Sequence, residues 1–232
     1  RGNNYIMMGC KSPEHILLKA SDGASDYGNK IGEPLVLGFA RDFGITCGNT
    51  RREWLKPIMF SGGVGMVSDK NTIKDEPQKG MKIIRIGGPA YRIGMGGGSA
   101  SSRSQSDSDS SQNMMAVQRG DPQMENKVVR VIRLLSSMER NPIVSIHDQG
   151  AGGMGNVTKE IVGGKGGVVD IASSFIGDDT MTSLEVWCAE YQEQVSCLIE
   201  EDDLELVKQV CRREGVDCSC IGWVSGDGNI KV

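Results

Sequence analysis

One aspartate in the sequence, Asp148, stands where an open α/β sheet would bind a ligand. Residues 143–146 form an apolar run typical of a strand, and His147 and Asp148 follow it directly, before a glycine-rich turn into a helix. The Asp148 carboxylate offers the hard oxygen ligands that Mg²⁺ prefers, and it could bridge the ion to a phosphate. The pattern supports equally a second interpretation, in which Asp148 caps the next helix. We interpret His147 as a packed or surface histidine.

Glycines are dense after a second apolar run, residues 81–86. Six glycines fall within residues 87–98, and such a loop can present backbone N–H groups to phosphate oxygens. It is not a P-loop, because no Gly-Lys-Ser/Thr ends it, and it does not match the dinucleotide fingerprint. On composition alone a flexible connection is about as well supported as a ligand-binding loop, so both interpretations stay open.

Two further polar segments could contact a ligand. Glu190, Tyr191 and Gln192 interrupt an apolar run just before a strand. Gln118 lies just outside the start of a helix, where its amide could hydrogen-bond a ligand amide or hydroxyl. Without other information, the pattern favours a solvated edge for the first segment and a surface position for Gln118.

The seven cysteines do not match a metal site or a disulfide framework. Their number is odd, and only two histidines accompany them. Cys218 and Cys220 are close together, but no second close pair completes a zinc motif. We interpret most of the cysteines as small buried hydrophobic residues of a protein in a reducing cytosol, and we assign no catalytic nucleophile.

Composition limits the classes of function. The net charge is −4, aromatic residues make up 5%, and no long basic run is present, which argues against a nucleic-acid partner. No apolar stretch is long enough to span a bilayer and no signal peptide is visible, so we expect no membrane partner and a cytoplasmic location. The sequence begins with Arg1 rather than Met, which we interpret as a piece of a longer protein.

The elements that must position these residues alternate between strands and helices from about Gly80 onward. Strands are expected at residues 81–86, 143–146, 168–171, 195–200 and 220–224. Helices are expected after Asp121-Pro122 (buried stripe Met124, Val128, Val131, Leu135, Met138), around Met154, Val157 and Ile161, and from a capping Asp202 through Leu206, Val207 and Val210 to Gly215. The alternation predicts a layered α/β (α+β) fold.

The first part of the chain gives a different pattern. Residues 19–65 are expected to be loop-rich, with one apolar run at residues 34–40. The polar residues 70–80 include Pro77 and form a plausible boundary, so we expect one domain part at residues 1–79 and a complete domain at residues 80–232. Further along, the Ser- and Asp-rich residues 99–111 are low in complexity, which is typical of a mobile loop.

Taken in order, these segments resemble the family of large, multidomain phosphoribosylformylglycinamidine synthases. The matching segments are Ser21 to Lys30, Lys56-Pro57-Ile58-Met59 with Gly62-Gly63, the glycine loop, Val117 to Pro122, the turn at Asp148, and Glu190-Tyr191-Gln192-Glu193. They extend over nearly the whole chain. Several long motifs in one order are far more specific than any single glycine loop.

The resemblance implies an ATP-dependent ligase of purine biosynthesis. Members convert formylglycinamide ribonucleotide, ATP and glutamine-derived ammonia into formylglycinamidine ribonucleotide, with Mg²⁺ offsetting phosphate charge. The implied fold of residues 80–232 is an aminoimidazole ribonucleotide synthetase-like C-terminal domain, with a mixed sheet and flanking helices. Residues 1–79 would be the end of the preceding N-terminal domain.

The resemblance also implies roles for particular residues. Asp148 matches the Mg²⁺ ligand of the family. Contacts to formylglycinamide ribonucleotide are implied for Gln118, Glu190, Tyr191 and Gln192, and a nucleotide-binding segment for Gly38, Phe39 and Ala40. The chain departs from many relatives at Met114-Met115, where an aromatic residue is usual, and at Gln123, where an acidic residue is usual.

Parts of the family's catalytic apparatus have no match in this sequence. We find no counterpart of the catalytic histidine loop, of the acidic metal-binding loop or of the glutaminase cysteine, so the fragment is expected to need the remaining domains of the enzyme. Alone, it should expose apolar surface and self-associate. Two alternatives are another ATP-dependent enzyme of the same fold (selenophosphate synthetase or thiamine monophosphate kinase), against which residues 190–193 argue, and a scaffold without binding activity.

Overall fold

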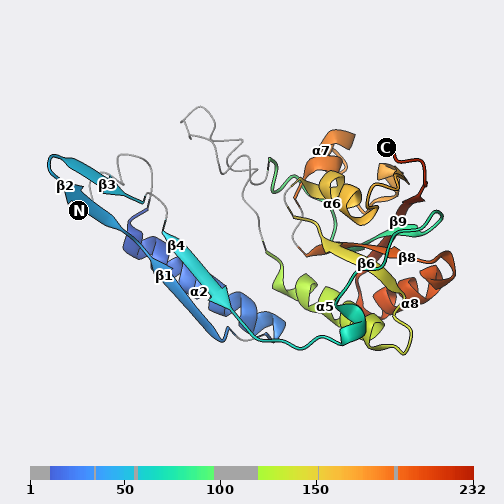
Figure 1. The fold of residues 1–232 in the computed structure, drawn as a ribbon, viewed down its shortest axis with the longest axis horizontal. Helices are drawn as coiled ribbons and strands as arrows, with labels where there is room; N and C mark the ends of the chain where they lie inside the picture. The colour runs from blue at the N-terminus through green and yellow to red at the C-terminus, as the bar shows by residue number, and fades with distance from the viewer. Residues whose placement is uncertain (1–10, 34, 55–56, 97–119, 151, 191–192) are drawn as a thin grey trace. The chain divides into compact units, whose positions relative to one another are not determined.

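The computed structural model describes residues 11–33, 35–54, 57–96, 120–150, 152–190 and 193–232 (Figure 1). The chain divides into two compact units, Arg1–Val67 and Ser68–Val232. Helices within the described ranges are all too short or too polar to cross a bilayer.

The first unit contains a long helix that the sequence interpretation missed. Helix α2 covers Pro13–Ile31, where residues 19 onward were expected to be loop-rich, so that expectation was wrong. Ser12 caps the helix by accepting a hydrogen bond from the His15 N–H, and Gly32 ends it in the left-handed conformation. Two internal glycines and several serines and aspartates, all weak helix formers, hid the helical pattern.

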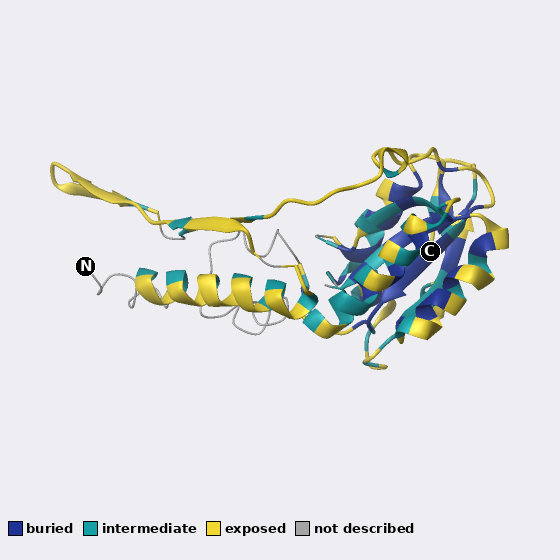
Figure 2. Ribbon diagram, turned by 90° about the horizontal axis from the view of Figure 1, so that it is seen from below, coloured by how far each residue is buried: buried dark blue, intermediate teal, exposed yellow. Residues whose placement is uncertain are grey.

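The described residues of the first unit also form two antiparallel strand pairs. Strand β1 (Leu37–Arg41) pairs with β4 (Ile58–Gly62), and β2 (Gly44–Cys47) pairs with β3 (Thr50–Glu53). Figure 2 shows no buried position in this unit, and none of its described residues is buried. Its apolar side chains therefore form surface within the unit rather than a core.

The second unit is built on a six-stranded mixed sheet. Its strand order is β10 (Ile230–Lys231), β7 (Gly167–Val169), β9 (Asp217–Val224), β5 (Lys82–Gly87), β8 (Gln194–Ile199) and β6 (Ile143–Asp148). Neighbours are antiparallel except β10 and β7, which are parallel. Five of the strands lie close to the expected ranges and β10 was not expected, and the predicted layered α/β fold with a mixed sheet is confirmed. Strand β7 ends two residues early, because Ile171–Ser173 form a 3-10 turn, η3.

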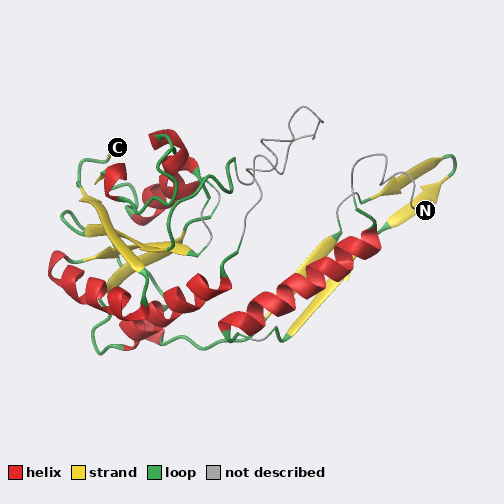
Figure 3. Ribbon diagram, turned by 180° about the vertical axis from the view of Figure 1, so that it is seen from behind, coloured by secondary structure: helices red, strands yellow, loops and turns green. Residues whose placement is uncertain are grey.

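Within the described part of this unit, four α-helices cover the two faces of the sheet (Figures 1 and 3). They are α5 (Pro122–Ser137), α6 (Gly153–Ile161), α7 (Ser183–Cys188) and α8 (Leu204–Glu214). On β5, Ile83 packs in one cluster with α6 and α7, whereas Ile84 and Ile86 pack in another with α5 and α8. This alternation follows from the two-residue period of a strand, and it produces one core on each face.

The helices confirm most of the expected apolar stripes. In α5, Val128, Val131 and Leu135 are buried, and Asp121 caps the helix by accepting the N–H groups of Gln123 and Met124. The predicted cap at Asp202 was wrong. A short 3-10 turn, η4 (Glu201–Asp203), precedes α8, and the buried Asp203 carboxylate pairs with Arg140 instead of capping the helix.

The cysteine interpretation is confirmed in part, because among the described cysteines Cys47 is exposed and Cys188 is only partly buried. Cys197 and Cys211 are buried, while Cys218 and Cys220 are partly buried against the same cluster, and no described cysteine forms a disulfide. Burial raises the pKa of the Cys197 thiol, which keeps it protonated and unreactive.

The segment that precedes β5 is hydrogen-bonded to the end of α5. Residues Asp69–Asn71 form a 3-10 turn, η1. Lys70 Nζ donates to the carbonyls of Met138 (2.7 Å) and Glu139 (3.2 Å), and the Asn71 amide donates to the Ser136 carbonyl (3.3 Å). These donors satisfy carbonyls that the end of α5 leaves without partners.

Candidate functional site

Three segments singled out in the sequence meet at one edge of the sheet. At the carboxyl end of β5, Gly87 pairs with Gln194, and at the carboxyl end of β6, Asp148 pairs with Val195. The Gln149 N–H also donates to the Gln194 carbonyl at 2.9 Å. The glycine loop, the Asp148 turn and the chain entering β8 are thus neighbours in space.

Glycines allow these segments to approach closely. A Cβ atom on Gly87 would overlap the Glu193 carbonyl, one on Gly94 the Glu190 carbonyl, and one on Gly153 the Ala189 carbonyl. All three glycines have positive φ (139°, 62° and 59°), which side chains rarely adopt. The density of glycine in this region therefore serves close packing of one backbone against another.

A buried arginine lies beneath the glycine loop. Arg85, 1% exposed, donates from Nε to the Gln194 amide oxygen (2.7 Å) and from its Nη atoms to the carbonyls of Gly88 (2.7 Å) and Phe175 (3.2 Å). The Gln194 side chain, itself buried, also donates to the Gly88 carbonyl (2.6 Å). A buried charge is tolerated only when it is hydrogen-bonded in this way, so the network fixes the conformation of Gly88.

A second arginine joins the loop to the helix α7. Arg92 Nε donates to Glu185 Oε1 (2.8 Å), and Nη1 donates to Asp178 Oδ2 (2.8 Å). These hydrogen bonds lower the pKa of Glu185 to about 2 and raise the pKa of Arg92. The pKa of Asp178 is lowered mainly by hydrogen bonds from the Thr180 hydroxyl and N–H. The cluster is therefore fully ionised near neutral pH.

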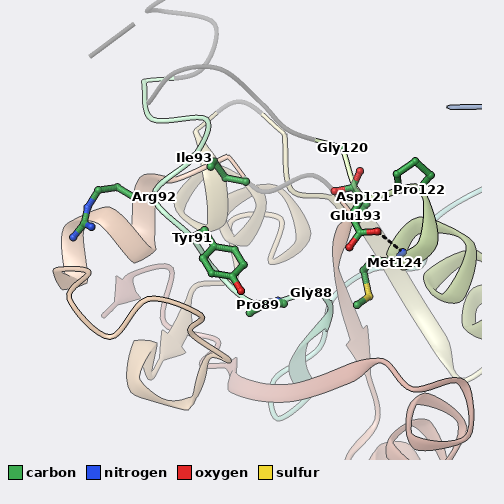
Figure 4. Close-up of a pocket in the computed structure, with 10 residues that line it drawn as sticks. All are labelled: Gly88, Pro89, Tyr91, Arg92, Ile93, Gly120, Asp121, Pro122, Met124 and Glu193. Atoms are coloured by element: carbon green, nitrogen blue, oxygen red, sulfur yellow. Dashed lines mark hydrogen bonds between the residues drawn. The ribbon is translucent and has the colours of Figure 1, made fainter. Parts of the chain in front are cut away.

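A cavity of about 600 Å³ lies between the glycine loop and the start of α5 (Figure 4). Tyr91 and Ile93 line it from the loop, and Asp121 and Met124 from the helix. Glu193 completes the wall. A volume of this size suits a small molecule, and its mixture of apolar and polar groups is typical of ligand pockets.

Glu193 has an unusual backbone. Among the described residues other than glycine, it alone has a positive φ, 55°. This conformation costs about 1–2 kcal/mol, and such strain in a folded protein is typically found at ligand sites. Glu193 belongs to the Glu190-Tyr191-Gln192-Glu193 motif, but the sequence predicted no role for it.

Asp148 lies at the expected place, at the carboxyl end of β6. Its side chain is 81% exposed, and the neighbouring His147 contacts Asp148 through Nδ1 and Glu160 through Nε2 (2.5 Å). Helix α6 begins at Gly153 after the N-cap residue Gly152, without a side-chain cap, so the capping interpretation of Asp148 was wrong. An exposed carboxylate fits Mg²⁺, which keeps several water ligands and takes few from protein. Within the described ranges, no group of three or more His, Cys, Asp or Glu side chains could hold a metal.

The remaining predicted site residues divide into three sets. Glu190 is half-buried against Gly94 at the edge of the sheet. Gln118, Tyr191 and Gln192 lie outside the described residues. Gly38, Phe39 and Ala40 belong to β1 of the first unit, where Phe39 stacks on Phe60 with ring centroids 5.3 Å apart and Arg41 lies over the Phe39 ring.

Sequence reasoning missed both arginines. For Arg85 a signal was present, because one arginine inside an otherwise apolar strand run must be either misplaced or bonded in the interior. Arg92 had no comparable signal, since its partners lie 86 and 93 residues further along the chain.

Comparison with known proteins decides the family. Residues 78–232 match the family described as AIR synthase related protein, C-terminal domain. The chain belongs to this family. The expected aminoimidazole ribonucleotide synthetase-like fold of the second unit is thereby confirmed.

Family relatives carry the name to which the motifs pointed. The chain is 51% identical, over 95% of its length, to the "Probable phosphoribosylformylglycinamidine synthase, chloroplastic/mitochondrial" of Arabidopsis thaliana. It spans only 16% of that relative, and 16–17% of the others compared.

Solved structures share the fold. "T. maritima PurL complexed with FGAR" superposes with a TM-score of 0.71 at 20% identity, over 89% of this chain and 33% of that chain. "T. maritima PurL complexed with ATP" gives a TM-score of 0.63 at 19% identity, over 89% of this chain and 31% of that one. At these identities the likeness concerns the fold alone.

Proposed function

We propose that this chain is the part of a phosphoribosylformylglycinamidine synthase that holds the ribonucleotide substrate. The observation that carries the proposal is the meeting of the glycine loop, Glu193 and the start of α5 around a cavity of about 600 Å³. The 51% identity to the named Arabidopsis relative supports it, as does the common fold with a protein described as complexed with FGAR.

In this proposal the intact enzyme is an ATP-dependent ligase and glutamine amidotransferase of purine biosynthesis. It converts formylglycinamide ribonucleotide, ATP and glutamine-derived ammonia into formylglycinamidine ribonucleotide. Polar side chains of Gln118, Glu190, Tyr191 and Gln192 contact the ribonucleotide. The catalytic residues of the enzyme lie in the remaining domains, so turnover requires those domains.

Asp148 is proposed as a Mg²⁺ ligand, and Gly38, Phe39 and Ala40 as nucleotide contacts. A bound Mg²⁺ would offset the negative charge of ATP phosphates. The exposure of the Asp148 carboxylate, 81% of its side chain, supports this role, because it leaves room for water and phosphate oxygens around the ion.

The domain limits are proposed at residue 80. Residues 1–79 would be the end of an N-terminal domain and residues 80–232 a complete C-terminal domain, with residues 68–79 packed in the second unit. Exposed apolar residues of the first unit, such as Val36, Leu37 and Phe60, support burial by the remaining domains. For the same reason the separate chain is expected to self-associate, and a strictly monomeric chain in light scattering at high concentration would contradict this.

A cytoplasmic location completes the proposal. It rests on the reducing environment that the unpaired cysteines favour. The Arabidopsis relative is named chloroplastic/mitochondrial, so fractionation of cells that express the tagged full-length protein is the deciding measurement.

The substrate proposal is tested by binding and turnover in the full-length protein. We expect formylglycinamide ribonucleotide and Mg-ATP both to bind in calorimetry and to be consumed. Asp148→Asn should raise the Mg²⁺ concentration needed for half-maximal rate by about tenfold, through loss of one charged ligand. Asp202→Asn, at an exposed aspartate of η4, is the matched control and should match the unchanged protein.

Two outcomes would reject the proposal. If the full-length protein neither binds nor consumes the ribonucleotide, the chain is a scaffold or serves another substrate. If Asp148→Asn and Asp202→Asn show the same Mg²⁺ dependence, Asp148 does not hold the ion.

A further inference from the structure

Arg92 connects two parts of the candidate site through its whole guanidinium group. Nε and Nη2 donate to the two carboxylate oxygens of Glu185 (2.8 and 3.2 Å). Nη1 donates to Asp178 Oδ2 (2.8 Å) and to the Thr180 hydroxyl (3.2 Å), while Nη2 also donates to the Thr180 carbonyl (2.9 Å). This planar, partly bidentate arrangement fixes orientation as well as distance, which a lysine could not do.

Glu185 is a residue of α7, so its ion pair with Arg92 also restrains this helix. Its carboxylate also accepts the Thr182 N–H (2.8 Å), and its backbone N–H donates to the Thr182 hydroxyl, so the two residues form a capping box. At the other end of the short helix, the Ala189 N–H donates to the Glu185 carbonyl (2.9 Å). Glu190 is the next residue, five positions after Glu185.

The same loop touches Glu190 a second time. Two residues after Arg92, the backbone of Gly94 approaches the carbonyl and Cβ of Glu190 so closely that no side chain fits. The loop therefore holds the α7 segment at two places, through Arg92 at Glu185 and through Gly94 at Glu190. Contacts at two places fix the orientation of the α7 segment, whereas a single contact would leave the segment free to rotate about it.

Arg92 is arranged to hold other residues. Although it lines the cavity, Figure 4 shows its side chain directed away from Tyr91 and Ile93. Its charge already faces two carboxylates, Glu185 and Asp178. A phosphate would have to compete with both, so this arginine is poorly suited to bind the anionic end of a ligand directly.

We infer that Arg92 is a positioning residue of the substrate site, which holds Glu190 in place through α7 and so sets the affinity for the ribonucleotide. The inference rests on the proposed function for the identity of the ligand. It assigns a role to an ion cluster whose other members, Asp178, Thr180 and Glu185, lie outside the predicted contact residues.

The test compares four single variants of the full-length protein and the double variant that combines Arg92→Gln with Glu185→Gln. Arg92→Gln and Glu185→Gln break the cluster from its two sides, and Arg92→Lys keeps the charge without the planar fork. Lys208→Gln is the matched control, because it removes an exposed ion pair with Glu205 on α8. Steady-state kinetics give KM for formylglycinamide ribonucleotide, KM for ATP, and kcat, and hydrogen exchange follows residues 186–190.

We expect Arg92→Gln and Glu185→Gln each to raise KM for the ribonucleotide about tenfold, with KM for ATP unchanged. Combined, they should have nearly the effect of Arg92→Gln alone, because both remove the Arg92–Glu185 ion pair. Arg92→Lys should recover only part of the affinity. Amides 186–190 should exchange faster in both Gln variants, while α5 keeps its protection.

The outcomes separate this inference from the proposed function. If the unchanged protein does not act on the ribonucleotide, the proposed function fails, and unchanged exchange at residues 186–190 in Arg92→Gln then rejects the positioning role independently. If the unchanged protein is active but Arg92→Gln behaves like Lys208→Gln, the inference is wrong. A large effect of Arg92→Gln without any effect of Glu185→Gln would show direct ligand contact instead, and equal changes in both KM values with a lower Tm would show a general structural role.

Discussion

Gly94 packs against Glu190 with its backbone, at a separation that leaves no room for a Cβ atom. This contact joins the glycine loop to the segment that enters β8, and its φ of 62° adds a second requirement for glycine. The pair therefore offers a direct way to test whether the geometry of the loop matters for stability and binding.

Gly94→Ala should destabilise the chain by more than conformational strain alone. Left-handed strain for alanine is about 1–2 kcal/mol, and overlap with the Glu190 carbonyl adds to it. Gly164→Ala is the control, because Gly164 has a φ of 79° and open space where a Cβ would lie. Equal losses of unfolding free energy for the two variants in urea would show that the close contact between Gly94 and Glu190 does not contribute to stability.

Arg85→Met should destabilise the chain by about 3 kcal/mol, because the buried amide oxygen of Gln194 and the partly buried carbonyl of Phe175 lose their donor. Urea unfolding followed by circular dichroism measures the loss. Arg130→Met removes an arginine of which 54% of the side chain is exposed and which pairs with Glu214, and this change should cost less than about 1 kcal/mol. Similar costs for the two changes would contradict the importance of the buried network.

Acid should weaken the cluster around Arg92. The folded-state pKa of Glu185 is about 2, below its ordinary value of 4.5, mainly because of the hydrogen bond from Arg92. A lowered pKa means that Glu185 adds stability which is fully present above pH 4.5 and is lost as the pH falls toward 2. The Tm difference between the unchanged chain and Glu185→Gln should therefore shrink over this window, and parallel Tm curves would disprove the linkage.

Glu193→Gly should separate stability from binding. Removing the strain of the positive φ should raise the free energy of unfolding by about 1–2 kcal/mol. The greater conformational freedom of glycine in the unfolded chain should lower it by about 1 kcal/mol. We expect stability in urea within about 1 kcal/mol of the unchanged chain, and weaker ribonucleotide binding by calorimetry in the full-length protein. A substantial loss of stability would show that Glu193 serves the fold instead.

Much of the second unit could be predicted because its signals are local. The Asp121-Pro122 start of α5 and the burial of Val128, Val131 and Leu135 follow from capping chemistry and helical period. Asp148 was placed correctly at a strand end. The short helix α7 was missed, although Thr182 and Glu185 carry the spacing of a capping box.

The remaining errors have physical causes. Four consecutive acidic residues, Glu200 to Asp203, offered several caps, and only the distant Arg140 decides that Asp203 is buried. The joining of Gly94 to Glu190 and of Arg92 to Glu185 depends on tertiary contacts between segments about 90 residues apart. No local pattern contains that information.

The hydrogen bonds from Lys70 and Asn71 to the end of α5 determine where a truncated version of the protein should begin. A shortened version beginning at residue 80 would lose both donors, so the last turn of α5 should fray. A version beginning at residue 68 would keep them. For recombinant production and crystallisation of the second unit, the twelve residues before residue 80 therefore belong with the helix that follows them.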